Sequence, residues 1–469
     1  MRQGPLRSLL VVVAGLLAFS ACPADPPPPA GPVWAPGVTH ASDATPIRGF
    51  VDVRGLVHSH SVYSHDACDG EPVLADGTRD PVCFDDFRRG LCQSKHDFAF
   101  LTDHRESFTD TELPEALLYR PERGDTLIEH DGVGTANRAA CDDGSSAIIM
   151  AGAEAGMMPV GLEHHVPGDR GGVYGERTPE AAQAEHDAGA VVLLAHPEDF
   201  SVAELLDLPV DGFEMFNLHA NTFLGMGVAL DFILRWQEGD TGLPHPDLLV
   251  FGIYSEDPRY LQRWGNVLAT GRHLVTTMGT DCHRNTFAVI LEDGERGDSY
   301  RRMMTAFSNH VRARPLADGT LDDRAVKEAL AAGRNYGAFE MLGTPVGFDV
   351  HADKDGTTWE MGDTVPTGAT LVVDAPSVRD LDPAAQAPVV RLRVVRATSD
   401  EAGFVEVATT TDAQLSVPLS EPGAYRAEVR ILPWHLRDHL RNDAYGYLDV
   451  AAEEGRDYVW IYGGALYVQ

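Results

Sequence analysis

Short apolar runs alternate with longer amphipathic stretches between about residues 54 and 339 of the chain. The runs have the length of β-strands and cover 54–57, 98–101, 147–150, 190–194, 212–216 and 274–278. The stretches between them predict helices, among them one that begins with Thr178-Pro179-Glu180 and others over 223–237 and 321–332. This alternation is typical of βα units around a largely parallel sheet.

Beyond about Gly343 the pattern changes to strand-like segments interrupted by Gly, Pro and Asp. Strands are predicted over 389–395, 424–430, 458–462 and 466–468, and no segment there has the period of a major helix. We therefore expect an α/β domain over residues 49–342 and a small C-terminal β-sandwich domain over 343–469.

The start of the chain has the character of a signal peptide. Arg2 and Arg7 precede an apolar run from Leu9 to Phe19, which is too short to span a bilayer permanently. Ser20-Ala21-Cys22 follows and resembles the lipobox of bacterial lipoproteins, with cleavage nearby without lipidation as the alternative. We expect a lipoprotein signal peptide over 1–22 and a Pro-rich linker over 23–48. The protein would then be exported and lipid-anchored to a bacterial membrane, on its periplasmic or cell-surface face.

Acidic residues outnumber basic ones by 71 to 37, which gives a formal net charge of −34. Such a surface repels phosphate backbones, so stable nucleic-acid binding is not expected, but the charge does not identify a substrate. Export would place the cysteines in an oxidising compartment. We expect two disulfides among Cys68, Cys83, Cys92 and Cys141, with all three pairings open.

Histidine and acidic residues recur immediately after the predicted strands. They are His58-Ser59-His60, Asp103-His104, Glu154, His196 and Asp281-Cys282-His283, with Ser64-His65-Asp66 and His164-His165 on nearby segments. The period of two in an extended chain puts the imidazoles of His58 and His60 on one face. The C-terminal strand ends of a βα barrel meet at one mouth, so we expect these side chains to lie together. Imidazole with carboxylate suits zinc, manganese or iron at a hydrolytic site.

In this order the motifs resemble those of the PHP (polymerase and histidinol phosphatase) domain, over roughly residues 54–340. The resemblance implies a distorted seven-stranded βα barrel with two or three divalent metal ions, Zn or Mn in the first place and Fe as an alternative. It implies one metal bound by His58, His60, Glu154 and Asp281. Glu154 would bridge to a second metal bound by His196 and by His164 or His165, of which we favour His165. A third would take His104, His283 and a residue of the first loop, where we favour Asp66 over His65.

Such a site is that of a metal-dependent hydrolase, and the resemblance makes a phosphoesterase the first hypothesis. A hydroxide that bridges two cations would be the nucleophile. Asp103 is a candidate to orient a histidine or water, Arg105 to contact a substrate oxyanion, and His219 to protonate the leaving group. Glu214 is a second candidate for an orienting role. The expected substrate is a small-molecule phosphate ester or a related ester.

The same residues are compatible with two other functions. The same nucleophile attacks a carbonyl carbon, so a carboxyl or carbamate ester hydrolase would use the same site. A non-catalytic surface lipoprotein, in which metals brace a binding module, would also contain them.

Overall fold

The computed structural model describes residues 38–469 except 71 and 241, so the predicted signal peptide, Cys22 and residues 23–37 of the predicted linker lie outside the described residues. The described chain has a mixed α/β fold with one large mixed sheet and two smaller antiparallel sheets. Within this part of the chain, no helix combines the length and the apolar character needed to cross a membrane.

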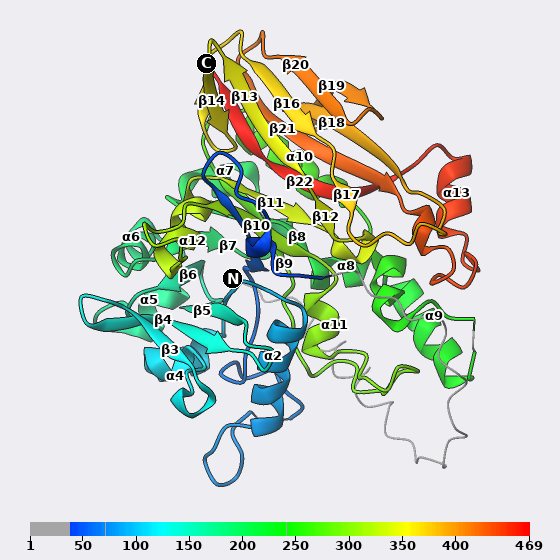
Figure 1. The fold of residues 1–469 in the computed structure, drawn as a ribbon. Helices are drawn as coiled ribbons and strands as arrows, with labels where there is room; N and C mark the ends of the chain where they lie inside the picture. The colour runs from blue at the N-terminus through cyan, green and yellow to red at the C-terminus, as the bar shows by residue number, and fades with distance from the viewer. Residues whose placement is uncertain (1–37, 71, 241) are drawn as a thin grey trace.

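The large sheet runs through most of the molecule (Figure 1). Its strands, in spatial order, are β19 (Phe404–Thr410), β18 (Val389–Ala397), β21 (Gly423–Leu432), β22 (Tyr458–Val468), β11 (Asn335–Ala338), β10 (Ser308–Ala313), β1 (Val51–Leu56), β2 (Phe98–Phe100), β5 (Ser146–Gly152), β6 (Met158–Leu162), β7 (Val191–Leu194), β8 (Gly212–Asn217) and β9 (Val275–Gly279). β15 (Thr364–Val365) pairs with β22, while β3 (Thr126–His130) pairs with β4 (Val133–Ala140), which in turn pairs with β5.

The six strands predicted before residue 343 are all present in this sheet as β1, β2, β5, β7, β8 and β9, here called the central strands. β1, β2 and β5 are parallel neighbours, and so are β7, β8 and β9. Burial on both faces explains why these strands are nearly continuous apolar runs. β6 and β10 were not predicted, and each runs antiparallel to both of its neighbours. The sheet is therefore mixed where we expected a largely parallel one.

Asparagine side chains join β9, at one end of the strand order, to β10 and β11. Asn309 accepts from the backbone N–H of Met278 at 2.8 Å and donates to its carbonyl at 2.8 Å. Asn335 of β11 donates to the carbonyl of Thr276 at 2.7 Å. The central strands thus curl so that the ends of β1 and β9 come close together, with Asp281 N donating to His58 O at 3.0 Å. The complete seven-stranded barrel stays a prediction.

The C-terminal strands continue the large sheet, because β22 pairs with β11. A separate four-stranded antiparallel sheet contains β14 (Thr357–Glu360), β13 (Asp349–Lys354), β16 (Thr370–Asp374) and β20 (Gln414–Pro418), and β12 (Pro345–Val346) pairs with β17 (Ser377–Val378). Inward residues of the two larger layers, such as Val373 and Val429, belong to one hydrophobic core. These layers lie at the top of Figure 1. The boundary between 342 and 343 stays a prediction.

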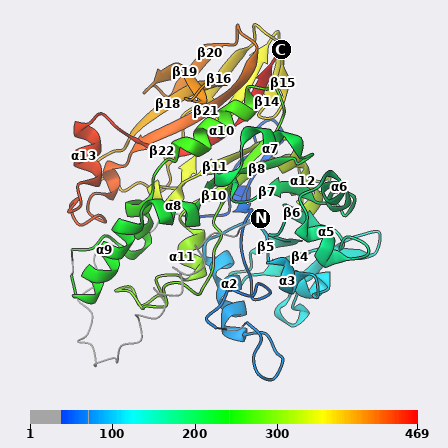
Figure 2. The same cartoon turned by 180° about the vertical axis from the view of Figure 1, so that it is seen from behind.

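Most helices pack around the central strands, whereas α10 lies along β18 and β19 and α13 contacts β21 (Figure 2). The helices are α2 (Pro81–Gln93), α3 (Arg105–Phe108), α4 (Leu113–Ala116), α5 (Arg170–Gly175), α6 (Pro179–Asp187), α7 (Val202–Asp207), α8 (Leu218–Leu224), α9 (Met226–Gln237), α10 (Pro258–Leu268), α11 (Tyr300–Met304), α12 (Asp323–Ala331) and α13 (Tyr447–Glu453). Thr178 caps α6 as predicted, through a 3.1 Å hydrogen bond from Ala181 N. The helix predicted over 223–237 is interrupted at Gly225, where a Cβ would lie 2.8 Å from Ile253 Cβ.

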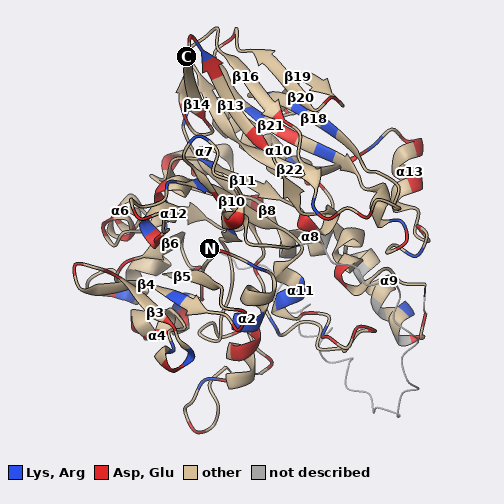
Figure 3. Ribbon diagram, in the orientation of Figure 1, with Lys and Arg blue, Asp and Glu red and all other residues tan. Residues whose placement is uncertain are grey.

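The predicted pair of disulfides is confirmed, and its connectivity is Cys68–Cys83 and Cys92–Cys141. Both disulfides attach to α2, one near each end of the helix. Acidic and basic residues are spread over both the α/β part and the C-terminal layers (Figure 3), so neither charge is confined to one region.

Candidate metal centre

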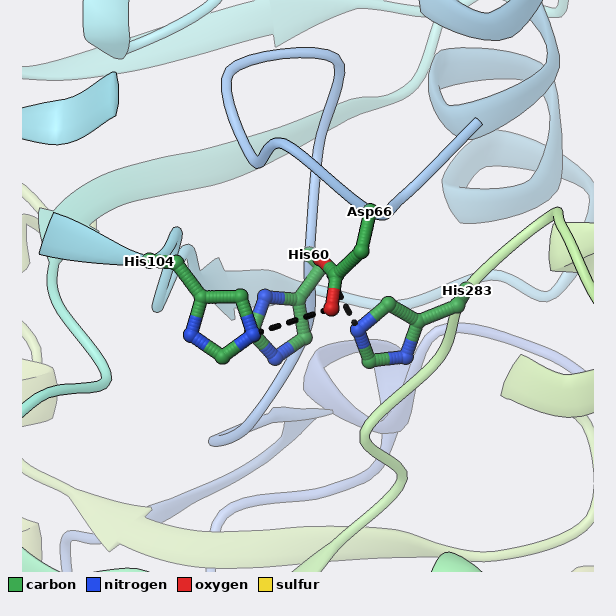
Figure 4. A group of neighbouring side chains, drawn as sticks. All are labelled: His60, Asp66, His104 and His283. Carbon is green, nitrogen blue, oxygen red and sulfur yellow. Dashed lines mark hydrogen bonds and ion pairs between the residues drawn. The ribbon is translucent and has the colours of Figure 1, made fainter. Parts of the chain in front are cut away.

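Two adjacent groups of four side chains gather beyond the ends of the central strands. In each group the ligand-type atoms, one from each residue, all lie within 4.8 Å of one another. The first, here called the Glu154 group, contains His58, Glu154, His196 and Asp281. The second, here called the Asp66 group, contains His60, Asp66, His104 and His283 (Figure 4).

The spacing from the strand ends divides seven of these residues into two layers. His58, Glu154, His196 and Asp281 each lie two residues beyond the last residue of β1, β5, β7 and β9. His60, His104 and His283 each lie four residues beyond the ends of β1, β2 and β9. Alternation of side chains along extended backbone directs His58 and His60 to the same side. The two motifs with one intervening residue therefore supply a member to each group.

Backbone contacts hold these post-strand segments together. Isolated β-bridges pair Ser59 with Cys282 and His104 with Glu154. His196 and Asp281 both have left-handed backbone conformations, with φ of 48° and 49°. Such a conformation costs free energy for a non-glycine residue and is concentrated at functional sites. The surrounding contacts keep two members of the Glu154 group in this conformation.

Carboxylate oxygens lie among the imidazole nitrogens of the Glu154 group. His196 Nε2 is 3.2 Å from Glu154 Oε1 and 3.1 Å from Asp281 Oδ2. His58 Nε2 is 3.5 Å from Glu154 Oε2 and 3.4 Å from Asp281 Oδ1. The two carboxylates also reach the neighbouring group, since His60 Nε2 lies 3.2 Å from Glu154 Oε2 and 3.1 Å from Asp281 Oδ1.

In the Asp66 group one carboxylate faces three imidazoles, as Figure 4 shows. Asp66 Oδ2 lies 3.1 Å from His104 Nε2, and Asp66 Oδ1 lies 3.5 Å from His283 Nε2. The rings of His60 and His283 stack with centroids 4.1 Å apart. His104 Nδ1 is 3.4 Å from Glu154 Oε2, so the two groups form one continuous centre.

The hydrogen-bond partners of His58 and His60 decide which ring nitrogens face the centre. His58 Nδ1 lies 2.6 Å from Glu214 Oε1 and donates to it, so Nε2 of this ring would be the atom offered to a bound cation once it has lost its proton. Ser64 Oγ donates its proton to Asp66 Oδ1 at 2.9 Å and so accepts from His60 Nδ1 at 3.1 Å. The two Nε2 atoms lie 3.1 Å apart. These two atoms and the carboxylates of Glu154 and Asp281 thus converge on one place, an arrangement that suits a cation.

The pKa shifts of Glu154 and His104 also show that opposite charges stabilise one another in this centre. Burial alone would raise the pKa of Glu154, yet the imidazoles of His58, His196 and His60 hold it well below its ordinary value. Burial alone would lower the pKa of His104, but Asp66 and Glu154 raise it to about 9. The Glu154 carboxyl group is therefore ionised, and the positive charge that stabilises it comes from the imidazoles beside it.

Several predicted residues lie elsewhere. His165 Nε2 is 2.8 Å from Thr111 O and its ring packs against Phe108, so it belongs to neither group. The physical reason is the direction of β6, which runs antiparallel to β5 and β7 and carries the chain away from the ligand-bearing strand ends. His164 is exposed. His65 is also exposed, although its ring centroid is 4.9 Å from that of His104.

Of the two candidate orienting residues, Glu214 contacts a histidine of the centre as expected, whereas Asp103 contacts a loop. Both carboxylate oxygens of Asp103 accept from Ser61, at 2.6 Å from its N–H and 2.8 Å from its hydroxyl, so Asp103 holds the loop after His60. Glu214 is the residue that orients His58. His219 lies in α8, and its side chain lies outside the described part of the structure.

An open cavity of about 520 Å³ lies beside the centre. Its lining consists of His104, Arg105, Glu106, Glu154, Ala155, Gly156, Gly175 and Arg177. Arg105 Nη1 donates to Gly171 O at 3.2 Å, and a Cβ on Gly175 would lie only 1.8 Å from that nitrogen. Arg177 Nε donates to Gly156 O at 2.6 Å, and its guanidinium lies 4.7 Å from the centroid of the Phe200 ring. Sequence reasoning identified Arg105 but missed Arg177, which belongs to no motif.

Comparison with known proteins gave two distant structural likenesses. No family model matches the chain, and no curated protein matches it. A two-domain protein from Bacteroides vulgatus, described as containing a predicted PHP-like metal-dependent phosphoesterase, is 12% identical, with 85% of this chain and 95% of that chain covered and a TM-score of 0.32. PsfC from Pseudomonas syringae is 13% identical, with 60% of this chain and 89% of that chain covered and a TM-score of 0.33. Likenesses this weak assign no function, so the assignment rests on the side chains themselves.

Proposed function

We propose that the protein is a metal-dependent hydrolase of the PHP type, and specifically a phosphoesterase. The observation that carries this proposal is the pair of adjacent four-residue groups, in which His58 Nε2 and His60 Nε2 lie 3.1 Å apart beside the carboxylates of Glu154 and Asp281. The order of the five sequence motifs supports the family. A structural bracing role would need one closed group, whereas here two groups adjoin a cavity of about 520 Å³.

The residues present suit divalent cations, with Zn or Mn as the proposed metals and Fe as the alternative. The Glu154 group would hold one cation and the Asp66 group another, and Glu154 and Asp281 lie within reach of both. We propose two cations, because His165 lies outside both groups. When bound, the cations supply Lewis-acid chemistry and a nucleophile at neutral pH.

The chain's own residues then orient the ligands and the substrate. Glu214 fixes the ring of His58, and Asp103 fixes the backbone of Ser61 next to His60. Arg105 and Arg177 line the cavity beside Glu154, where a guanidinium pairs well with the oxygens of a phosphate group. These two cationic side chains favour an anionic ester over a neutral carboxyl ester as the substrate.

The test is a side-by-side assay of the purified protein reconstituted with Mn²⁺ or Zn²⁺. Aryl phosphate monoesters and diesters and an aryl carboxyl ester would be compared, with the Asp281→Ala variant as the control. We expect metal-dependent cleavage of at least one phosphate ester. Cleavage of the carboxyl ester alone would replace the phosphoesterase by a carboxyl ester hydrolase. Metal binding without cleavage of any ester would favour the non-catalytic binding lipoprotein.

We further propose export and anchoring through Cys22, supported by the apolar run before it and the Pro-rich segment after it. A Cys22→Ala variant expressed in a bacterium should move from the membrane fraction to the soluble fraction. Membrane association that survives this substitution would contradict the lipid anchor.

A further inference from the structure

The Asp66 group has one member that no strand end positions. His60, His104 and His283 each follow a strand by four residues, whereas Asp66 lies ten residues beyond the end of β1. It belongs to the stretch 57–80, whose described residues, all but 71, form neither a helix nor a named strand. A stretch of this length without regular structure does not fix a carboxylate by itself. Ser64 Oγ, within the stretch, donates to Asp66 Oδ1 at 2.9 Å, and further support must come from outside the stretch.

The tethers of this stretch converge on the residues directly after Asp66. Cys68 forms the disulfide with Cys83 in the first turn of α2, and both cysteines are buried. Ala67 O accepts from Arg284 N at 2.7 Å and from Tyr300 Oη at 3.3 Å. Tyr300 Oη also donates to His60 O at 2.9 Å, which ties the stretch to another member of the group.

The helix that carries Cys83 is itself held firmly. At Gly90 of α2, a Cβ would lie 2.7 Å from Arg301 N and 2.9 Å from Tyr300 Cβ, so α2 and α11 are in direct contact. The disulfide thus links the segment after Asp66 to a rigid pair of helices. Tyr300 belongs to that same pair and touches the same segment.

We propose that the Cys68–Cys83 disulfide is the positioning element of the Asp66 group, so that the cation of this group binds tightly only when the disulfide is closed. The inference rests on the proposed metal-dependent function. It assigns the disulfide a role in metal affinity, beyond its contribution to folding stability. The cation of the Glu154 group does not depend on it, because all four members of that group follow strand ends directly.

The chain supplies a matched control in its second disulfide. Cys92–Cys141 attaches to the other end of the same helix and closes a sequence separation of 49 residues, against 15 for Cys68–Cys83. In the loop-entropy view, loss of the longer closure costs more stability. A variant that lacks Cys92–Cys141 should therefore melt at the lower temperature, while its Asp66 group stays intact.

The experiment measures the number and affinity of cations in four proteins by titration with Mn²⁺ alone. They are the wild type, Cys68→Ala/Cys83→Ala, Cys92→Ala/Cys141→Ala and Asp66→Ala. We expect two tight cations in the wild type and in the Cys92/Cys141 variant. The Cys68/Cys83 and Asp66 variants should keep one tight cation and bind the second at least ~10-fold more weakly, with occupancy restored at high Mn²⁺.

Each other result overturns the inference in a recognisable way. Two cations of wild-type affinity in the Cys68/Cys83 variant would refute the positioning role alone. Equal weakening in both disulfide variants, or weakening that follows the melting temperature of the metal-free proteins, would show a purely structural role. A wild type that binds no cation would refute the proposed function and this inference with it.

Discussion

The two groups of the metal centre use similar side chains but are supported in different ways. The Glu154 group has two carboxylates, and all four of its members lie two residues beyond a strand end. The Asp66 group has one carboxylate, and that carboxylate comes from a stretch held by a disulfide and by hydrogen bonds. The comparison teaches that the sheet alone builds the first group, whereas the second needs tethers added outside the sheet.

Removal of one carboxylate from each group, Asp281 from the first and Asp66 from the second, should give the largest difference in activity. Asp281 lies within 3.4 Å of imidazole nitrogens in His58, His60 and His196, so Asp281→Ala should lower kcat/KM by at least ~10³-fold. Asp66→Ala should cost activity through one cation only and leave the Glu154 group loaded. Metal analysis together with phosphate-ester kinetics measures both. Equal losses of both cations in the two variants would remove the distinction between the groups.

Substitution of Glu214, which orients His58, should have a smaller effect. Glu214→Gln keeps the size of the side chain but weakens the 2.6 Å hydrogen bond to His58 Nδ1. We expect the cation of the Glu154 group to bind ~10–100-fold more weakly, with the other cation less affected. Glu185→Gln is the control, because Glu185 is equally buried and lies in α6, outside both groups. Equal weakening of Mn²⁺ binding in Glu214→Gln and Glu185→Gln, measured by calorimetric titration, would contradict the orienting role of Glu214.

The cavity wall should affect substrate affinity more than metal binding. Arg177→Ala is expected to raise KM for an aryl phosphate by ~10-fold, through loss of a charged hydrogen bond, and to leave the number of bound cations unchanged. Arg177→Lys should recover part of the loss. Arg123→Ala, which removes a guanidinium that contacts Asp85 away from the cavity, is the control. An equal rise in KM for a neutral aryl ester would argue against recognition of an anion.

The smallest effect on activity is expected at Glu185, a buried carboxyl whose oxygens have no hydrogen-bond partner among the described residues. Burial raises its pKa to about 8, in contrast to Glu154, whose pKa the nearby imidazoles lower. Between its unfolded pKa of about 4.5 and about 8, the folded state keeps a proton that the unfolded state has lost, so stability falls as pH rises.

Glu185→Gln should therefore stabilise the protein above pH ~8, by up to a few kcal/mol, and give little gain below pH ~4.5. Melting of the metal-free wild type and variant at both pH values measures this difference. Equal gains at both pH values would point to packing instead of ionisation.

Strand ends were predictable from sequence because buried parallel strands are continuous apolar runs and ligands stand directly after them. Seven of the eight residues in the two groups follow a strand end in this way. The eighth, Asp66, was favoured because of the resemblance to the PHP domain. His165 was favoured under the resemblance, which carries no information about the direction of β6. Arg177 reaches the cavity only through the turn between α5 and α6, and no local spacing reports such a long-range approach. Asn309 and Asn335 likewise act between strands far apart in sequence.

The alternation that aims His58 and His60 at the centre also turns Ser59 the other way, towards Cys282, which lies between Asp281 and His283. Ser59 and Cys282 pair with each other and are fully buried. The odd cysteine of the described chain is thus enclosed within the protein. Under the proposed export, this burial would shield the thiol from exchange with the Cys68–Cys83 and Cys92–Cys141 disulfides. The tripeptide 281–283 therefore carries two candidate metal ligands and, between them, a thiol kept away from solvent.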